Sequence, residues 1–92
     1  MTHATDNPTR NRYEMPIDGE TAFVTYTSRG NQITLVHTEV PAALNGRGIG
    51  SKLARSVLED IRRRGLSVIP ECEFIAGFIQ RNPEFADLLA IG

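Results

Sequence analysis

The hydrophobic positions follow a strand pattern in the first half of the chain. Between Tyr13 and Val40, β-branched and aromatic residues gather in short runs separated by turn residues, as is typical of β-strands. The predicted strands are Tyr13–Ile17, Thr21–Thr27 and Ile33–Val40. Asp18-Gly19 favours a tight hairpin turn, and Ser28–Gln32 favours a second turn. The first half is therefore predicted to be an antiparallel meander.

In the second half, the apolar residues recur at helical spacing. One face would carry Ile49, Leu53, Ala54, Val57, Leu58 and Ile61. This pattern predicts an amphipathic helix that stops at Gly65. A short apolar run, Leu66–Ile69, predicts one more strand. Two further helices are predicted over Phe74–Arg81 and Pro83–Ala90, with Asn82 as the N-cap of the last one.

The element order is thus β-β-β-α-β-α-α, which describes an α/β (α+β) domain. A chain of 92 residues is expected to form one domain. Residues 1–12 are polar and are predicted to be a flexible N-terminal tail, so the domain is expected to span residues 13–92.

Composition narrows the function classes. The formal net charge of −1 argues against nucleic acid and membrane surfaces as partners, since both require a basic excess. No apolar run is long enough to span a bilayer, and the N-terminus lacks the apolar core of a signal peptide, so we expect a cytoplasmic protein. Cys72 is the only cysteine, and with His3 and His37 it makes no zinc-ligand spacing, so no metal is expected.

The stretch LNGRGIGSKL carries three alternating glycines, Gly46, Gly48 and Gly50, just where the long helix begins. The first amides of a helix have no partner within it and carry the positive end of its dipole. A glycine-rich approach lets a phosphate or pyrophosphate reach those amides, and Arg47 would add positive charge at the rim. The alternative is a tight strand-to-helix connection without a ligand. The spacing fits neither the P-loop nor the dinucleotide fingerprint.

These motifs resemble a known family. The chain contains HTEVP, then LNGRGIGSKL, then a short predicted strand, a cysteine and NPEF. In this combination it resembles the small GNAT-type (Gcn5-related) N-acetyltransferases, specifically the short YjdJ-like group, over about Tyr13 to Leu89. The resemblance implies a GNAT-like fold, a mainly antiparallel sheet packed with helices, and acetyl-coenzyme A as cofactor.

The family's coenzyme A signature, [Q/R]-x-x-G-x-[G/A], falls on Asn45–Gly50. By resemblance, the cofactor-binding residues are Val40, Asn45, Gly46, Arg47, Gly48, Ile49, Gly50 and Ser51. The main chain around Val40 would hold the pantetheine arm. Asn45 stands where Gln or Arg is usual, which removes a long polar side chain. Phe78 and Phe85 occupy places where the family leads us to expect tyrosine, so no tyrosine there can act as a general acid.

Three side chains are candidates for catalysis. His37 and Glu39 lie two apart on one predicted strand and therefore face the same side. Glu39 is the candidate base for the amine proton, and the alternative is a solvated charge at a strand end. His37 is either part of the site or a partly buried histidine hydrogen-bonded in the sheet. Cys72 would accept the acetyl group or protonate the departing thiolate, unless it is an inert cysteine packed at a strand end.

The sequence therefore predicts an acetyl-coenzyme A-dependent N-acetyltransferase that acts on a primary amine of a small molecule or a protein. Two alternatives stay open. One is a module that binds coenzyme A or acyl-coenzyme A without efficient transfer, and the other is a ligand-free protein-interaction domain on the same fold. The arginine cluster Arg62–Arg64 is interpreted as a solvated helix end.

Overall fold

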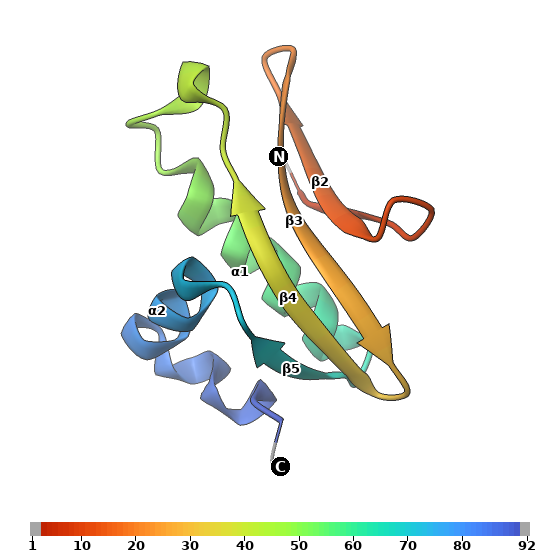
Figure 1. The fold of residues 1–92 in the computed structure, drawn as a ribbon. Coiled ribbons are helices and arrows are strands. Elements are labelled where there is room, and N and C mark those ends of the chain that lie inside the picture. Colours follow the sequence, from red (N-terminus) through yellow and green to blue (C-terminus); the bar gives the residue numbers. More distant parts are fainter. Residues whose placement is uncertain (1–2, 91–92) are drawn as a thin grey trace.

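The structure, a computed structural model, describes residues 3–90 and contains one five-stranded sheet with two α-helices (Figure 1). The strands are β1 (Thr5–Asn7), β2 (Arg12–Ile17), β3 (Glu20–Arg29), β4 (Gln32–Glu39) and β5 (Ser67–Pro70). The helices are α1 (Ile49–Arg63) and α2 (Glu73–Arg81), with 3-10 turns η1 (Ala42–Leu44) and η2 (Pro83–Leu88). The strands lie in the sheet in chain order, β1-β2-β3-β4-β5.

The predicted meander is confirmed. Neighbouring strands from β1 to β4 pair antiparallel, and only β4 and β5 pair parallel. Between β2 and β3, Asp18 and Gly19 both have positive φ (51° and 81°). Two left-handed residues give the turn whose twist matches that of a hairpin, which explains the Asp-Gly pair. The predicted fold class, a mixed sheet with helices, is therefore what the chain forms.

The N-terminal segment differs from the predicted tail. Thr5–Asn7 forms β1 and pairs antiparallel with Arg12–Glu14 of β2. The amide of Ala4 also donates a hydrogen bond to Ser56 Oγ on α1 (2.8 Å). The sequence Thr-Asp-Asn has no apolar residue, so nothing in its pattern signalled a strand. The first two residues of the predicted tail lie outside the described residues.

The core lies between one face of the sheet and α1. Every residue predicted for the apolar face of the long helix is buried. They pack against alternate strand residues, among them Tyr13, Met15, Val24, Ile33 and Leu35, all nearly inaccessible to solvent. Full burial of one large apolar side chain contributes about 1.5–3 kcal/mol. This burial fixes α1, and hence the segment that leads into it, against the sheet.

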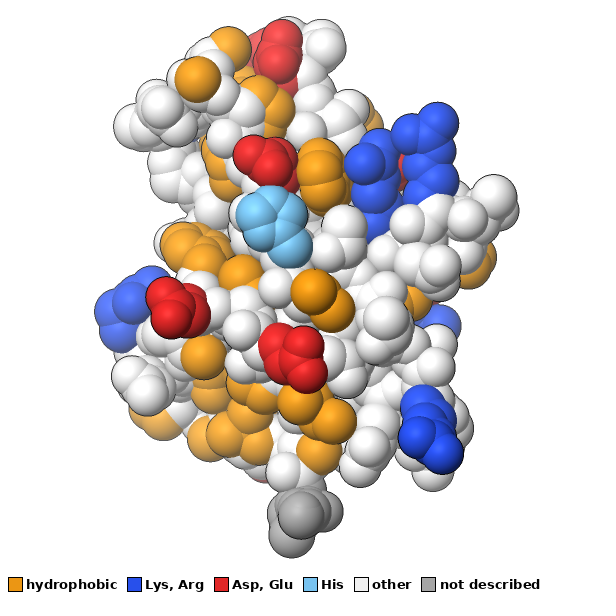
Figure 2. All heavy atoms as spheres, in the orientation of Figure 1, with side chains coloured by type: hydrophobic (Ala, Val, Ile, Leu, Met, Phe, Trp, Pro, Cys, Tyr) orange, Lys and Arg blue, Asp and Glu red, His pale blue; other side chains and the backbone are white. Residues whose placement is uncertain are grey.

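The other face of the sheet, which we call the open face, is turned to the viewer in Figure 1, with α1 behind it. Figure 2 shows this face with hydrophobic, acidic and polar side chains intermixed. α2 packs beside α1 and β5 through Ile75, Phe78 and Ile79. No helix covers the open face in the described part of the chain.

The end of α2 corrects one prediction. Asn82 is not a side-chain N-cap of the last helix, because its side chain makes no hydrogen bond to η2. Its Nδ2 donates instead to the carbonyl of Phe78 (2.9 Å) and so satisfies the C-terminal end of α2. Asn82 stands between α2 and η2, and its side-chain amide binds a carbonyl at the C-terminal end of α2. The last element is a 3-10 helix that ends at Leu88 rather than an α-helix to Ala90.

Candidate functional site

A gap opens beside β4 where β5 leaves it. β4 pairs with β3 up to Glu39 but with β5 only from Gln32 to Leu35. The chain then turns from β5 into α2, and the amide of Cys72 donates to the Leu35 carbonyl (2.9 Å) at the base of the gap. The backbone of β4 beyond Leu35 therefore has one edge without a strand partner. We call this space the β4 gap.

A β-bulge sits at the start of the unpaired edge. Thr25 of β3 lies opposite His37, whereas the next residue, Tyr26, lies opposite Leu35, so Val36 is an extra residue in β4. A bulge re-aims the side chains that follow it. His37 and Glu39 consequently face the open side of the sheet, and Thr38 faces the helix side.

The glycine loop, Gly46–Gly50, lies just beyond β4 and leads into α1. Gly46 and Gly48 have φ of 79° and 69°, a left-handed region that favours glycine. Gly48 is the N-cap of α1 and offers no side-chain cap, and no acidic residue stands in the first turn. The amides of Ile49, Gly50 and Ser51 find no hydrogen-bond acceptor among residues 3–90. The helix start thus presents free donors and the positive end of the helix dipole.

A cavity of about 280 Å³ lies against this loop. It is lined by Val40, Leu44, Asn45, Gly46, Gly48, Ile49, Gly50, Ser51 and Phe74. The structure therefore brings together all the residues predicted to bind the cofactor except Arg47. Two lining residues were missed, buried Leu44 and partly exposed Phe74. The ring of Phe74 packs on Gly50 so closely that a Cβ there would lie 2.8 Å from its Cζ, a contact no sequence pattern signals.

Arg47 points away from this cavity. Its Nη1 donates to Asp18 Oδ2 (2.6 Å) in the β2–β3 turn, and its side chain lines a different cavity. The positive charge expected at the rim is therefore directed to the other side of the loop. Only the backbone of Arg47 lies in the glycine loop as expected.

His37 and Glu39 form a pair on the open face. Nε2 of His37 lies 3.0 Å from Oε1 of Glu39, which confirms that the two side chains share one side of β4. Both side chains are more than half exposed, so His37 is not a histidine held inside the sheet. The pair stands at the unpaired edge of β4, with its carboxylate accessible from solvent.

Cys72 lies apart from that pair. It is nearly buried at the start of α2, and its Sγ is 3.2 Å from Oγ1 of Thr38. Because Thr38 faces the helix side and its neighbours face the open side, β4 separates the thiol from Glu39. The three candidate catalytic residues thus form two groups, one on each face of β4. Thr38 was missed because the contact joins residues 34 positions apart.

Residues 3–90 lack the features of two further classes of site. No group of three His, Cys, Asp or Glu side chains is arranged to hold a metal ion. None of the helices there has the length and apolar character needed to cross a membrane.

The chain is similar to known proteins in sequence and in fold. The family model for GCN5-related N-acetyl-transferase matches residues 12–88. Protein NATD1 of Bos taurus is 34% identical over 77 residues, which cover 80% of this chain and 68% of the relative. Protein NATD1 of Homo sapiens is 32% identical over 77 residues, which also cover 80% of this chain and 68% of the relative.

A solved structure has the same fold. It is the NMR solution structure of a GCN5-like protein from Staphylococcus aureus, with a TM-score of 0.72 and 26% sequence identity. The match covers 96% of this chain and 87% of that one. The sheet and the helices that frame the glycine loop thus belong to a fold seen in a related protein.

Proposed function

The chain belongs to the GCN5-related N-acetyltransferase family, and we propose that it transfers an acetyl group from acetyl-coenzyme A to a primary amine of a small molecule or a protein. The family implies acetylation that depends on acetyl-coenzyme A. The observation that carries the proposal for this chain is the glycine-loop cavity, where the free amides of the helix start lie among residues that line a space of glycines and apolar side chains.

The glycine loop would hold the pyrophosphate of the coenzyme. Free amides at a helix start bind anions because the N–H groups and the helix dipole act together. The absence of an acidic residue from the first turn of α1 leaves this positive end uncompensated. Gly46 and Gly48 keep side chains out of the approach, and Phe74 gives the cavity an apolar wall.

The unpaired edge of β4 would receive the pantetheine arm. Beyond Leu35 the strand has no partner on the side of β5, so its backbone donors and acceptors are available to amide groups of a ligand. This edge lies between the glycine loop and the bulge at Val36. A ligand bound there would carry its thioester toward the space between Glu39 and Cys72.

The two groups beside the β4 gap suit two proton transfers. Glu39 would take the proton of the incoming amine from the open face, with His37 orienting the carboxylate. Cys72, with Thr38 as its hydrogen-bond partner, would return a proton to the departing thiolate. Because β4 separates the thiol from Glu39, we favour direct transfer of the acetyl group over an acetyl-cysteine intermediate.

The proposal is tested by acetyl transfer from acetyl-coenzyme A to a panel of diamines and lysine peptides, with coenzyme binding measured by calorimetry. Glu39→Gln should lower turnover by about 10²–10⁴-fold, the usual range for a general base, with coenzyme affinity unchanged. Glu20→Gln changes a half-buried carboxylate at the start of β3, away from the β4 gap; it is the control and should keep wild-type turnover. Turnover by the Glu39 variant at the wild-type rate would remove Glu39 from the mechanism.

The route of transfer is tested by mass spectrometry. Protein incubated with acetyl-coenzyme A and then denatured should carry no hydroxylamine-labile acetyl group, while Cys72→Ala and Thr38→Val should both slow turnover. A labile adduct that Cys72→Ala abolishes would instead support transfer through the thiol. Coenzyme binding without transfer to any amine of the panel would favour the binding-module alternative.

A further inference from the structure

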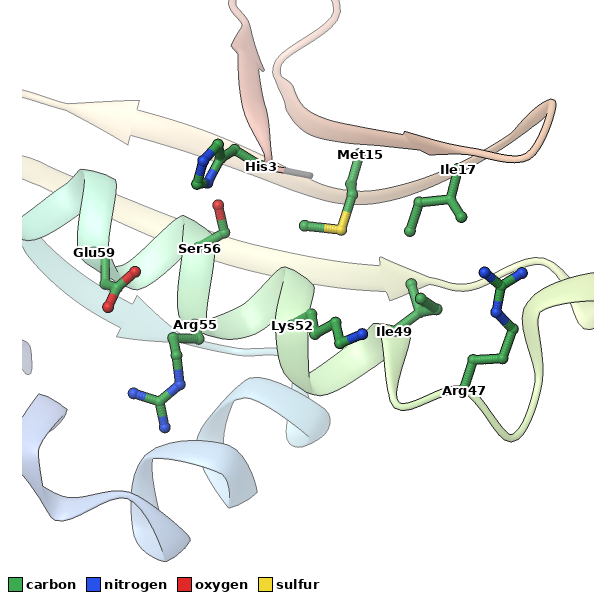
Figure 3. Close-up of a pocket in the computed structure, with 9 residues that line it drawn as sticks. All are labelled: His3, Met15, Ile17, Arg47, Ile49, Lys52, Arg55, Ser56 and Glu59. Atoms are coloured by element: carbon green, nitrogen blue, oxygen red, sulfur yellow. The ribbon is translucent and has the colours of Figure 1, made fainter. Parts of the chain in front are cut away.

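A second and larger cavity lies on the other side of the glycine loop. It has a volume of about 490 Å³ and is formed between β2 and the outward face of α1 (Figure 3). It shares only Ile49 with the glycine-loop cavity. Apart from Ile49, the proposed acetyl transfer uses neither its floor nor its charged rim. Its volume falls within the range of small-molecule sites, about 300–1,000 Å³.

The floor of this cavity is apolar. Met15 and Ile17 come from β2, and Ile49 comes from the first turn of α1. Met15 and Ile49 are almost fully buried, with 1% and 4% of their surface exposed. Because the core holds both side chains in place, the floor is preformed. An apolar floor of this kind accommodates the hydrocarbon part of a ligand.

The rim carries one free charge of each sign. Lys52 and Glu59 both line the cavity, and neither makes an ion pair with any residue of the described part, 3–90. They are seven residues apart on α1, which is about 10 Å along a helix axis. Figure 3 shows Lys52 directed toward the glycine-loop end and Glu59 at the opposite end, with Met15 and Ser56 between them.

The other two cations of the rim are already engaged. Arg47 is paired with Asp18. Arg55 is paired with Glu84, and its guanidinium lies over the ring of Phe85 (5.4 Å to the centroid), directed toward α2 and η2. The charges left for a ligand are therefore one ammonium and one carboxylate, so a dianion such as a phosphate monoester would meet an unpaired Glu59.

We propose that this cavity binds a linear zwitterion, with a carboxylate at Lys52, an ammonium at Glu59 and an apolar segment over Met15. An ω-amino carboxylate and a short apolar peptide share this chemistry. The two charges fix the ligand at its ends, and the apolar floor supplies contact area between them.

The test is titration of the protein with 8-aminooctanoate, followed by calorimetry and by amide chemical shifts along α1. Octanoate and octylamine, which each lack one charge, should bind about three- to fivefold more weakly, as expected for the loss of one exposed ion pair. A tri-leucine peptide is titrated in parallel. Whichever of the two binds more tightly indicates whether the cavity suits an ω-amino carboxylate or a short apolar peptide. No saturable binding of either zwitterion at millimolar concentration would overturn the proposal.

Exchanging the two charges of the protein tests the proposal with a single ligand. Lys52→Glu and Glu59→Lys should each weaken binding of 8-aminooctanoate about three- to fivefold. The double swap should restore it, because the zwitterion can bind in the reverse direction. Arg29→Glu, the same charge change on the β3–β4 hairpin, is the control and should bind as wild type. Equal affinity for all four variants, each verified as folded by circular dichroism, would show that the charges do not hold the ligand.

One more variant separates the two cavities. Gly48→Val, designed to block the glycine-loop cavity, should still bind 8-aminooctanoate with wild-type affinity. Loss of that binding would place the zwitterion in the glycine-loop cavity and overturn the assignment. This experiment does not depend on acetyl transfer, so failure of the proposed enzyme activity would leave its result interpretable.

Discussion

The two ends of α1 are finished in opposite ways. At its start, Gly48 provides no side-chain cap, and the first amides have no protein partner among residues 3–90. At its end, three successive arginines all make ion pairs: Arg62 with Asp87, Arg63 with Asp60, and Arg64 with both Asp6 and Asp60. The chain thus uses side chains to complete one end of a helix and leaves the other end open. We call the start of α1 the open end and the other the closed end, and we infer that the open end binds a ligand.

The closed end is a hydrogen-bonded network. The hydroxyl of Tyr13 donates to Asp60 Oδ2 (2.6 Å), and Arg64 donates to that hydroxyl (3.0 Å). Burial, with the hydrogen bond to Asp60, raises the pKa of Tyr13 well above its ordinary value. Partial burial acts to raise the pKa of Asp60, but hydrogen bonds from Tyr13 and Arg63 outweigh it and lower that pKa below 3.8. This end therefore serves stability, since it joins α1 to β1 and β2.

Blocking the open end should have the largest effect. Gly48→Val places a β-branched side chain at a left-handed position on the cavity wall and should weaken binding of acetyl-coenzyme A at least about 100-fold, through loss of charge-assisted hydrogen bonds worth about 1.5–3 kcal/mol each. Calorimetry measures the change.

Gly30→Val is the matched control, because Gly30 also has positive φ (59°) with open space around it but lies in the β3–β4 turn. It carries the same backbone strain and should bind the coenzyme normally. Equal loss in both variants would indicate a general effect of strain, and the contrast between the two ends would fail.

Removing the centre of the closed end should reduce stability without affecting binding. Asp60→Ala leaves the Tyr13 hydroxyl and Arg63 without the acceptor they share and removes one of the two carboxylates paired with Arg64, so it should lower the free energy of unfolding by about 1–3 kcal/mol. Asp87→Ala removes only an exposed pair with Arg62 and should lower it by about 0–1 kcal/mol. Urea denaturation measures both, and a change in coenzyme affinity of either variant would show that the two ends are not independent.

Acid should weaken the closed end selectively. The pKa of Asp60 is lower in the folded protein than its ordinary value of 3.8, so its contribution to stability is present above pH 3.8 and is lost as the pH falls through the folded value. The difference in unfolding free energy between wild type and Asp60→Asn should therefore be constant near neutral pH and shrink below pH 3.8. A difference that does not change with pH would mean that Asp60 acts through shape rather than charge.

Adding a charge to the open end should have the smallest effect. Asn45 is exposed at the cavity, and Asn45→Arg should tighten coenzyme binding by about 0.2–1 kcal/mol, the range of an exposed ion pair. Calorimetry at low ionic strength would detect this, and added salt should remove it. Weaker binding by the arginine variant would show that Asn45 itself makes a specific contact.

Local signals predicted the open end, because its information lies within a few residues. The spacing of Gly46, Gly48 and Gly50 and the helical period after them are read directly from the chain. The structure gathers these residues, with Val40, around one cavity. The pairing of His37 with Glu39 likewise followed from the alternation of a strand.

Long-range contacts could not be predicted in the same way. The partner of Arg47 is Asp18, from a hairpin far away in sequence, and no local pattern distinguishes that pairing from an exposed charge at the loop. The bulge at Val36 and the contact between Thr38 and Cys72 depend on how three strands and a helix meet. The short strand β1 is held by its neighbours rather than by its own apolar residues, so its sequence resembles a tail.

The arrangement of strands in chain order has a consequence for how the protein folds. Each of the first four strands finds its neighbour through a short turn, so closing those loops loses little entropy. Only β5 must wait for the crossover through α1 before it pairs with β4. We expect pulsed hydrogen exchange during refolding to protect β2–β4 first and β5 last. The β4 gap would then be the last part of the molecule to take shape, and the partly folded chain would have no site to occupy.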